Sequence, residues 1–189
     1  MASQEAVARY RIDSRMSRFT VKAFASGLFS VMGHDPTIAI RDYDGEAGFV
    51  PGTLDQAFVR ITARPDSLEV TDDIAEKDKL EIDSEMKQHV LETSRYSEIS
   101  FESLTISPTR MGDNRYVVNV TGNLKLHGVT RTHTIIAQVV LNSETFRAFG
   151  ELSLRQTDHG IKLVSVAGGT LKVKDELKLS IDIVARNQA

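Results

Sequence analysis

Apolar and polar residues alternate along most of this chain, and the alternation is clearest between Tyr116 and Leu141. On both sides of His127-Gly128, the apolar positions share one parity: Val118, Val120, Leu124 and Leu126 before the glycine, and Ile135, Ala137, Val139 and Leu141 after it. Because successive side chains of a strand point to opposite faces, the pattern predicts two long antiparallel strands with one buried face. Gly128 lies where a tight turn with a positive φ is expected.

The same alternation predicts strands in most of the remaining sequence. Further strands are expected near residues 9–13, 18–24, 37–50, 57–64, 68–70, 99–106, 143–155 and 176–185. Asp44-Gly45 is expected to form a turn that interrupts the strand at 37–50, and residues 27–36 a loop or a short helix. The sequence therefore predicts an all-β protein.

One segment, Ser84 to Thr93, has a different period. Met86 and Val90 are four residues apart there, and Asp83 or Ser84 can cap a helix. We therefore expect one short helix near residues 84–93. The charged residues at 72–85 are expected to form a solvated loop.

About eight strands of alternating character favour an extended antiparallel β-barrel, because closure leaves no unpaired sheet edge. A chain of 189 residues fits a single barrel domain, 1–189. A short helix in such a chain is expected to close one end of the barrel. Barrels of this size either fill their interior with side chains or hold one small ligand.

Composition excludes several functions. The net charge of −3 argues against a nucleic-acid partner, and the absence of cysteine excludes disulfides and thiolate chemistry. No apolar stretch approaches the roughly 20 residues of a membrane span, and no signal peptide is visible, so we expect a protein that does not span the membrane. The expected location is the cytoplasm, or the periplasm if a leader has been removed.

Several segments, taken in order, resemble the YceI-like family. They are Tyr10-Arg11-Ile12-Asp13, Ser17-Arg18-Phe19-Thr20-Val21, Gly27-Leu28-Phe29, the residues 95–103 (RYSEISFES), the residues 122–131 (GNLKLHGVTR) and the residues 155–161 (RQTDHGI). His159 stands where the family pattern has phenylalanine, and Ser97 where it has proline. The resemblance implies a lipocalin-like barrel that binds polyisoprenoid lipids.

The inward faces of the predicted strands carry many small and branched residues, which would leave room for an apolar chain if the barrel is hollow. The candidate lumen residues are Phe24, Phe29, Val59, Ile61, Phe101, Val118, Val120, Leu124, Ile135, Ala137 and Val139. If the ligand carries a phosphate, the candidates for binding its head group are His34, Arg131 and Arg155. The alternative is that the small residues pack together and fill the barrel.

The function expected from these observations is non-catalytic binding or carriage of a long apolar lipid, such as a polyisoprenoid. No cofactor and no metal are expected, because the histidines lack the spacing of a metal site. One alternative is an enzyme, such as a small-molecule hydrolase, that uses the loop at His34-Asp35. A second is a closed barrel that acts through its surface as an interaction or stress protein. A homodimer is compatible with each of these functions.

Overall fold

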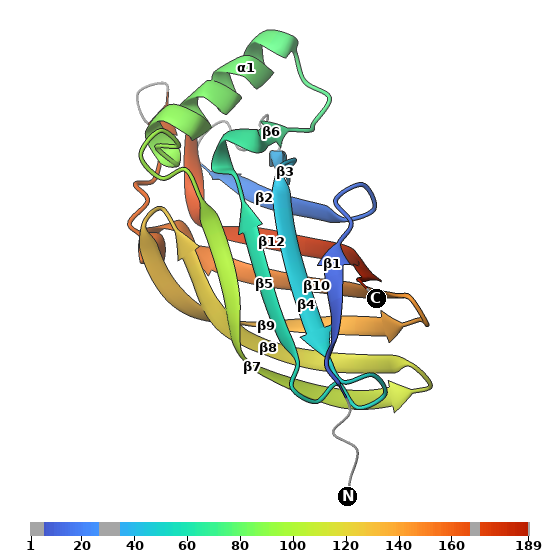
Figure 1. Ribbon diagram of the computed structural model, residues 1–189. Coiled ribbons are helices and arrows are strands. Elements are labelled where there is room, and N and C mark those ends of the chain that lie inside the picture. Colours follow the sequence, from blue (N-terminus) through green and yellow to red (C-terminus); the bar gives the residue numbers. More distant parts are fainter. Residues whose placement is uncertain (1–5, 27–34, 167–170, 189) are drawn as a thin grey trace, which may run out of the picture.

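Eight antiparallel strands close into a barrel in the computed structural model, which describes residues 6–26, 35–166 and 171–188 (Figure 1). Around the ring they are β1 (Ala8–Ile12), β4 (Tyr43–Phe49), β5 (Phe58–Ala63), β7 (Ile99–Gly112), β8 (Arg115–Leu126), β9 (Val129–Leu141), β10 (Thr145–Arg155) and β12 (Leu171–Asn187). The ring closes because β1 pairs with β4 on one side and with β12 on the other. The predicted all-β antiparallel barrel is confirmed.

Three further strands extend the sheet from β12 beyond the ring. They are β2 (Arg18–Ser26), β3 (Thr37–Ile40) and β6 (Leu68–Val70), which pair in the order β12-β2-β3-β6. Strand β12 pairs with β2 as far as Asp182 and with β1 from Ala185 onward. Strands β1 and β2 thus cover the length of β12 as one interrupted strand. A two-residue strand, β11 (Ser165–Val166), pairs with the start of β12.

The break between β3 and β4 lies at Arg41 and Asp42, so the turn predicted at Asp44-Gly45 was wrong. Asp44 lies within β4, where its carboxylate accepts hydrogen bonds from Arg11 on the outer face of the barrel, at 2.9 and 3.2 Å. The dipeptide resembles a turn because both residue types favour turns. Cross-strand pairing with β1 and β5 overrides that preference.

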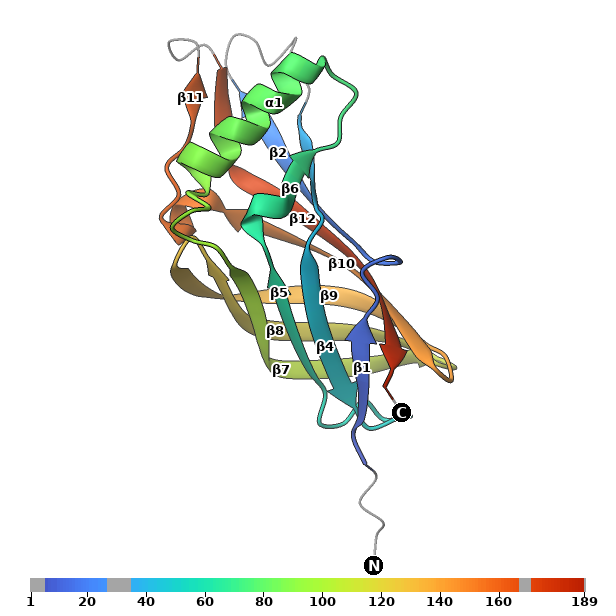
Figure 2. The ribbon, with the colours of Figure 1, turned by 45° about the horizontal axis from the view of Figure 1, so that its top comes forward.

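A helix covers the end of the barrel that we call the upper end (Figures 1 and 2). It comprises α1 (Glu76–Glu85) and a π-helical turn, η2 (Met86–Val90). The short 3-10 helices are η1 (Pro65–Ser67) and η3 (Gln156–His159). In the described part of the chain, no helix is long and apolar enough to cross a membrane.

The helix predicted near residues 84–93 covers only the second part of the observed helix, which runs from Glu76 to Val90. Helix α1 begins at Glu76, within the segment expected to be a solvated loop, and it buries none of its residues. Without a buried face it shows no apolar stripe, although glutamate, lysine and leucine are all good helix formers. Asp83 does not cap a helix; its carboxylate accepts a hydrogen bond from the N–H of Val70 on β6, at 3.0 Å.

The turn between β8 and β9 consists of His127 and Gly128, with φ values of 50° and 74°. Leu126 pairs directly with Val129, so this is a two-residue hairpin with both central residues at positive φ, as in a type I′ turn. A Cβ on Gly128 would lie 2.6 Å from a ring carbon of Tyr96. The predicted positive φ of Gly128 is confirmed.

Buried side chains pack both ends of the barrel. Below the helix the upper core consists of Leu68, Val70, Met86, Leu91, Leu126, Leu152, Leu154 and Ile161. At the opposite, lower end, the buried residues are Tyr10, Phe49, Leu54, Tyr116 and Phe146, and three of these rings contact one another at centroid distances of 4.7 to 5.8 Å. The middle of the barrel lies between these two packed regions.

Candidate functional site: an apolar cavity inside the barrel

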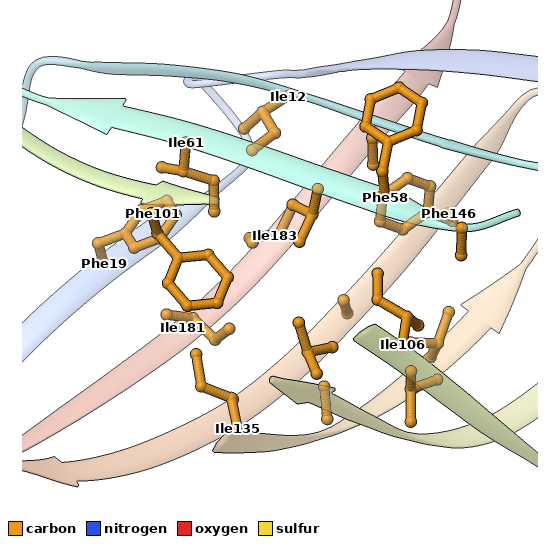
Figure 3. A pocket seen from close by; sticks show the side chains of 18 of the residues that line it. Ile12, Phe19, Phe58, Ile61, Phe101, Ile106, Ile135, Phe146, Ile181 and Ile183 are labelled. Carbon is orange, nitrogen blue, oxygen red and sulfur yellow. The ribbon is translucent and has the colours of Figure 1, made fainter. Parts of the chain in front are cut away.

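A cavity of about 170 Å³ occupies the middle of the barrel, and all the described residues that line it are apolar. Each of the eight ring strands contributes to the lining. Figure 3 shows side chains from several strands around this space, all built of carbon alone. An engineered cavity of roughly 150 Å³ with a similar apolar lining stays dry and binds benzene. The barrel therefore has room for an apolar group of at least that size.

Most of the predicted lumen residues line this cavity. They are Val59, Ile61, Phe101, Val118, Val120, Leu124, Ile135, Ala137 and Val139. Strand parity explains their placement, because the apolar face of each strand turns inward. That they bind a ligand stays a prediction.

Phe24 was the wrong choice as a lumen residue. Phe19 and Ala23 on β2 are buried, so Phe24 has the parity of the opposite face. The ammonium of Lys22, which shares that parity, lies 6.0 Å from the Phe24 ring centroid. Phe29 and the head-group candidate His34 lie outside the described residues.

Ile106 lines the cavity although strict alternation from Phe101 places it on the outer face. The pairing of β7 with β8 shifts between Ser103 and Thr105, so Leu104 forms a β-bulge that reverses the parity of the following residues. Five other lining residues were not predicted, although each lies on the apolar face of a strand with a regular alternation in the sequence. They are Ile12, Phe19, Phe146, Ile181 and Ile183.

Two glycines bring the wall side chains close to the backbone. A Cβ on Gly122 would lie 2.5 Å from the ring of Phe101, and a Cβ on Gly45 would lie 2.7 Å from Cδ1 of Ile12. The ring and the isoleucine therefore lie against the barrel wall. This arrangement keeps the centre of the barrel open.

The two described arginines proposed as head-group ligands lie away from the cavity lining. Arg131 is exposed, and its Nε donates to the carbonyl oxygen of Asp158 at 2.9 Å. Arg155 is also exposed; it is the last residue of β10, where it pairs with Glu176 of β12, directly before η3. Asp35, from the proposed catalytic loop, accepts a hydrogen bond from the N–H of Ala25 at 2.9 Å. This contact joins Asp35 to β2.

Two histidines form a pair at the upper end. The Nε2 atoms of His133 and His159 are 3.1 Å apart, and Nδ1 of the fully buried His159 lies 3.1 Å from the carbonyl oxygen of Val129. Because a carbonyl only accepts, His159 donates from Nδ1 and accepts from His133 at Nε2. Burial, and then the neighbouring His159, lower the pKa of His133.

His127, the other histidine of this corner, contacts Glu92 instead of His133. Its Nε2 lies 2.8 Å from a carboxylate oxygen of Glu92, and its ring lies 4.2 Å from that of Tyr96. Among the described residues, no three histidine, aspartate or glutamate side chains are grouped as a metal site requires. The hydrogen bonds of these histidines join the β8–β9 turn to Glu92 and η3 to β9.

Comparisons with solved structures find the same fold elsewhere. The crystal structure of BcnA from Burkholderia cenocepacia matches with a TM-score of 0.69 at 20% identity, over 92% of this chain and 98% of that one. A polyisoprenoid binding domain from Saccharophagus degradans, implicated in plant cell wall breakdown, matches with a TM-score of 0.66 at 14% identity, over 96% and 99%. The YceI protein of Campylobacter jejuni matches with a TM-score of 0.60 at 14% identity, over 80% and 84%.

A comparison with curated proteins gave no match. The family model of the YceI-like domain, however, matches residues 10–185. This match begins within β1 and ends within β12, two residues before the end of that strand, and so includes part or all of every ring strand and every residue that lines the cavity. The chain therefore belongs to the YceI-like family.

Proposed function

We propose that the protein binds one long apolar chain, a polyisoprenoid or a lipid of similar chemistry, in the barrel cavity. The observation that carries the proposal is a barrel whose interior is not filled by side chains and whose described lining is entirely apolar. Such a lining favours a ligand through the removal of apolar surface from water, which requires no polar contact. The likeness to a polyisoprenoid binding domain from Saccharophagus degradans supports the same ligand class.

The ligand is bound without covalent chemistry. Among the described residues, the cavity lining offers no hydroxyl, carboxylate, imidazole or amine. A bound chain would therefore meet no acid, base or nucleophile of the kind that catalysis requires. Binding or carriage of the lipid fits this lining better than its conversion.

The size of the cavity sets the affinity that we expect. A space of about 170 Å³ accommodates about as much carbon as one benzene ring. At about 0.8 kcal/mol per buried methylene, six carbons contribute roughly 5 kcal/mol. That gain barely exceeds the lower bound of roughly 4 kcal/mol for the association entropy. Tight binding of a long chain therefore requires wall side chains to move and enlarge the cavity.

A displacement titration tests the proposal. Purified protein is saturated with the apolar fluorophore N-phenyl-1-naphthylamine, which is then displaced by geraniol, farnesol and geranylgeraniol in turn. We expect saturable binding at one site per chain and an affinity that rises with each added isoprene unit, because each unit buries further methylenes. The absence of saturable binding for the fluorophore and for all three alcohols would refute the proposed function.

A further inference from the structure

The wall of the barrel has one side on which neighbouring strands are only partly paired. Strands β5 and β7 pair from Ala63 with Ile99 to Arg60 with Glu102, and there the ladder ends. The next N–H of β5, that of Val59, donates to the hydroxyl of Ser103 at 2.9 Å instead of to a backbone carbonyl. Below this point the lower half of β7 bends away from the direction of β5 (Figures 1 and 2).

The lower half of β7 has the features of a free edge. Within the described residues, the segment from Leu104 to Gly112 pairs with β8 on one side and with no strand on the other. It contains Pro108, a residue without an N–H that is confined to edge strands and bulges. Leu104, in the bulge where the pairing with β5 ends, is 59% exposed.

The cavity extends to both sides of this gap. Val59 on β5 and Ile106 on β7 line it, and both are only half-buried although they face inward. On the opposite wall, Ile12 and Ile183 also line the cavity but are 6% and 5% exposed. The inward face is therefore most accessible along β5 and β7.

The loop between β4 and β5 closes the cavity at the lower end of this gap. Its Leu54 lines the cavity and is 5% exposed, yet it has a φ of 61°, a left-handed conformation that is uncommon for leucine. Among the described residues, a hydrogen bond joins this loop to β8, the neighbour of β7: the Tyr116 hydroxyl donates to the Gly52 carbonyl at 3.0 Å. Strained residues cluster at ligand clamps and switch regions, and Leu54 lies at such a place beside the cavity.

Within the part of the chain that the structure describes, the upper end offers no comparable route. Leu68, Met86, Leu91 and Leu126 are buried beneath the helix, and none of them lines the cavity. A ligand that entered there would have to displace this packed layer. The partly paired wall is therefore the less obstructed route to the cavity.

We propose that apolar ligands enter the cavity sideways, between β5 and the lower half of β7, and that the Leu54 loop is the movable plug of this entrance. The inference rests on the proposed function and adds the route and the orientation of the ligand. The polar end of a bound lipid then lies outside the gap, near Ser103 and the ion pair of Arg60 with Glu102. It does not lie near Arg131 or Arg155 at the upper end.

Stopped-flow binding of N-phenyl-1-naphthylamine tests the plug. Tyr116→Phe removes the hydroxyl that holds the loop, so association and dissociation should both accelerate by about three- to tenfold while Kd stays within about twofold. Tyr43→Phe is the matched control, because the buried Tyr43 also donates its hydroxyl to a backbone carbonyl, that of Ser17 at 2.7 Å, but away from the plug. This control should leave both rates unchanged.

A second measurement tests the route itself. The chain has no cysteine, so Leu104→Cys at the gap and Gln138→Cys on the outer face of β9 can each be labelled with a maleimide-polyethylene glycol. The label at residue 104 should slow association at least tenfold, and the label at residue 138 by less than twofold.

The outcomes separate the entrance from the function. If the unmodified protein binds the fluorophore but Tyr116→Phe leaves both rates unchanged, or if the two labelled variants associate equally fast, the entrance is wrong and the proposed function stands. If the unmodified protein binds neither the fluorophore nor an isoprenoid alcohol at equilibrium, the proposed function fails and the entrance fails with it.

Discussion

Replacing Ala137 by phenylalanine would fill the cavity from the β9 wall. Ala137 lines the cavity and is 4% exposed. The substitution adds one six-carbon ring, the size of the benzene that enters an apolar cavity of roughly 150 Å³, and the space available is about 170 Å³. The ring should therefore occupy the space that we assign to the ligand.

The free energy of unfolding should respond little to this change. Full burial of a phenylalanine side chain contributes about 1.5 to 3 kcal/mol, and fixing its rotamer and adjusting its neighbours cost roughly 1 to 2 kcal/mol. We therefore expect Ala137→Phe to lie between about 0.5 kcal/mol less stable and about 2 kcal/mol more stable than the unmodified protein. Ala185→Phe is the matched control, since Ala185 is 0% exposed and does not line the cavity, so the same ring overpacks the core at a cost of about 1 to 3 kcal/mol.

Thermal denaturation and farnesol displacement, measured on both variants, check this reasoning. At about 2 to 4 °C per kcal/mol, the Tm of Ala185→Phe should fall by roughly 2 to 12 °C while that of Ala137→Phe stays nearly level or rises. Ala137→Phe should lose farnesol binding by at least about tenfold, and Ala185→Phe should retain it. If Ala137→Phe were destabilised as much as the control and still bound farnesol, the ligand would not occupy this cavity.

Three further predictions concern the frame around the cavity. Gly128→Val should lower the free energy of unfolding, measured in urea, by more than about 1 kcal/mol, because Gly128 has a positive φ and lies against an aromatic ring. Gly112→Val should lower it by less, since a Cβ at Gly112 meets open space. Equal losses in the two variants would contradict this reasoning. The pKa of His133 is lower in the folded state, so the unfolded chain binds a proton first as the pH falls, and the free energy of unfolding should decrease below about pH 6.5. His133→Gln should weaken this dependence of stability on pH. An unchanged dependence would show that His133 is not its source. Asp83→Ala should cost about 1 to 3 kcal/mol by orphaning the N–H of Val70, and an unchanged melting curve would show that water replaces the carboxylate.

Strand parity was sufficient to place most of the cavity lining. Ile61, Val120 and Ala137 line the cavity because each lies on the apolar face of a regularly alternating strand. Ile106 could not be found in this way, because the bulge at Leu104 reverses the parity and leaves no mark in the composition. Phe24 was predicted to line the cavity because it is aromatic, although it has the parity of the outward-facing residues of β2.

Features that depend on contacts between distant segments were beyond sequence reasoning. Helix α1 has no apolar stripe, so its charged sequence resembles that of a solvated loop, and only the structure shows a helix over the end of the barrel. The hydrogen bond between Tyr116 and Gly52, and the pairing of His133 with His159, join residues that local patterns do not connect. The plug and the buried histidine pair therefore required the three-dimensional structure.

The central claim is that the barrel interior is hollow and holds one apolar chain. Native mass spectrometry of the purified protein, before and after removal of bound lipid and again after incubation with geranylgeraniol, tests it most directly. We predict one bound apolar molecule per chain at purification or after incubation, and loss of that adduct in Ala137→Phe. A chain that carries no adduct in any of these states, although it is folded, would contradict the claim.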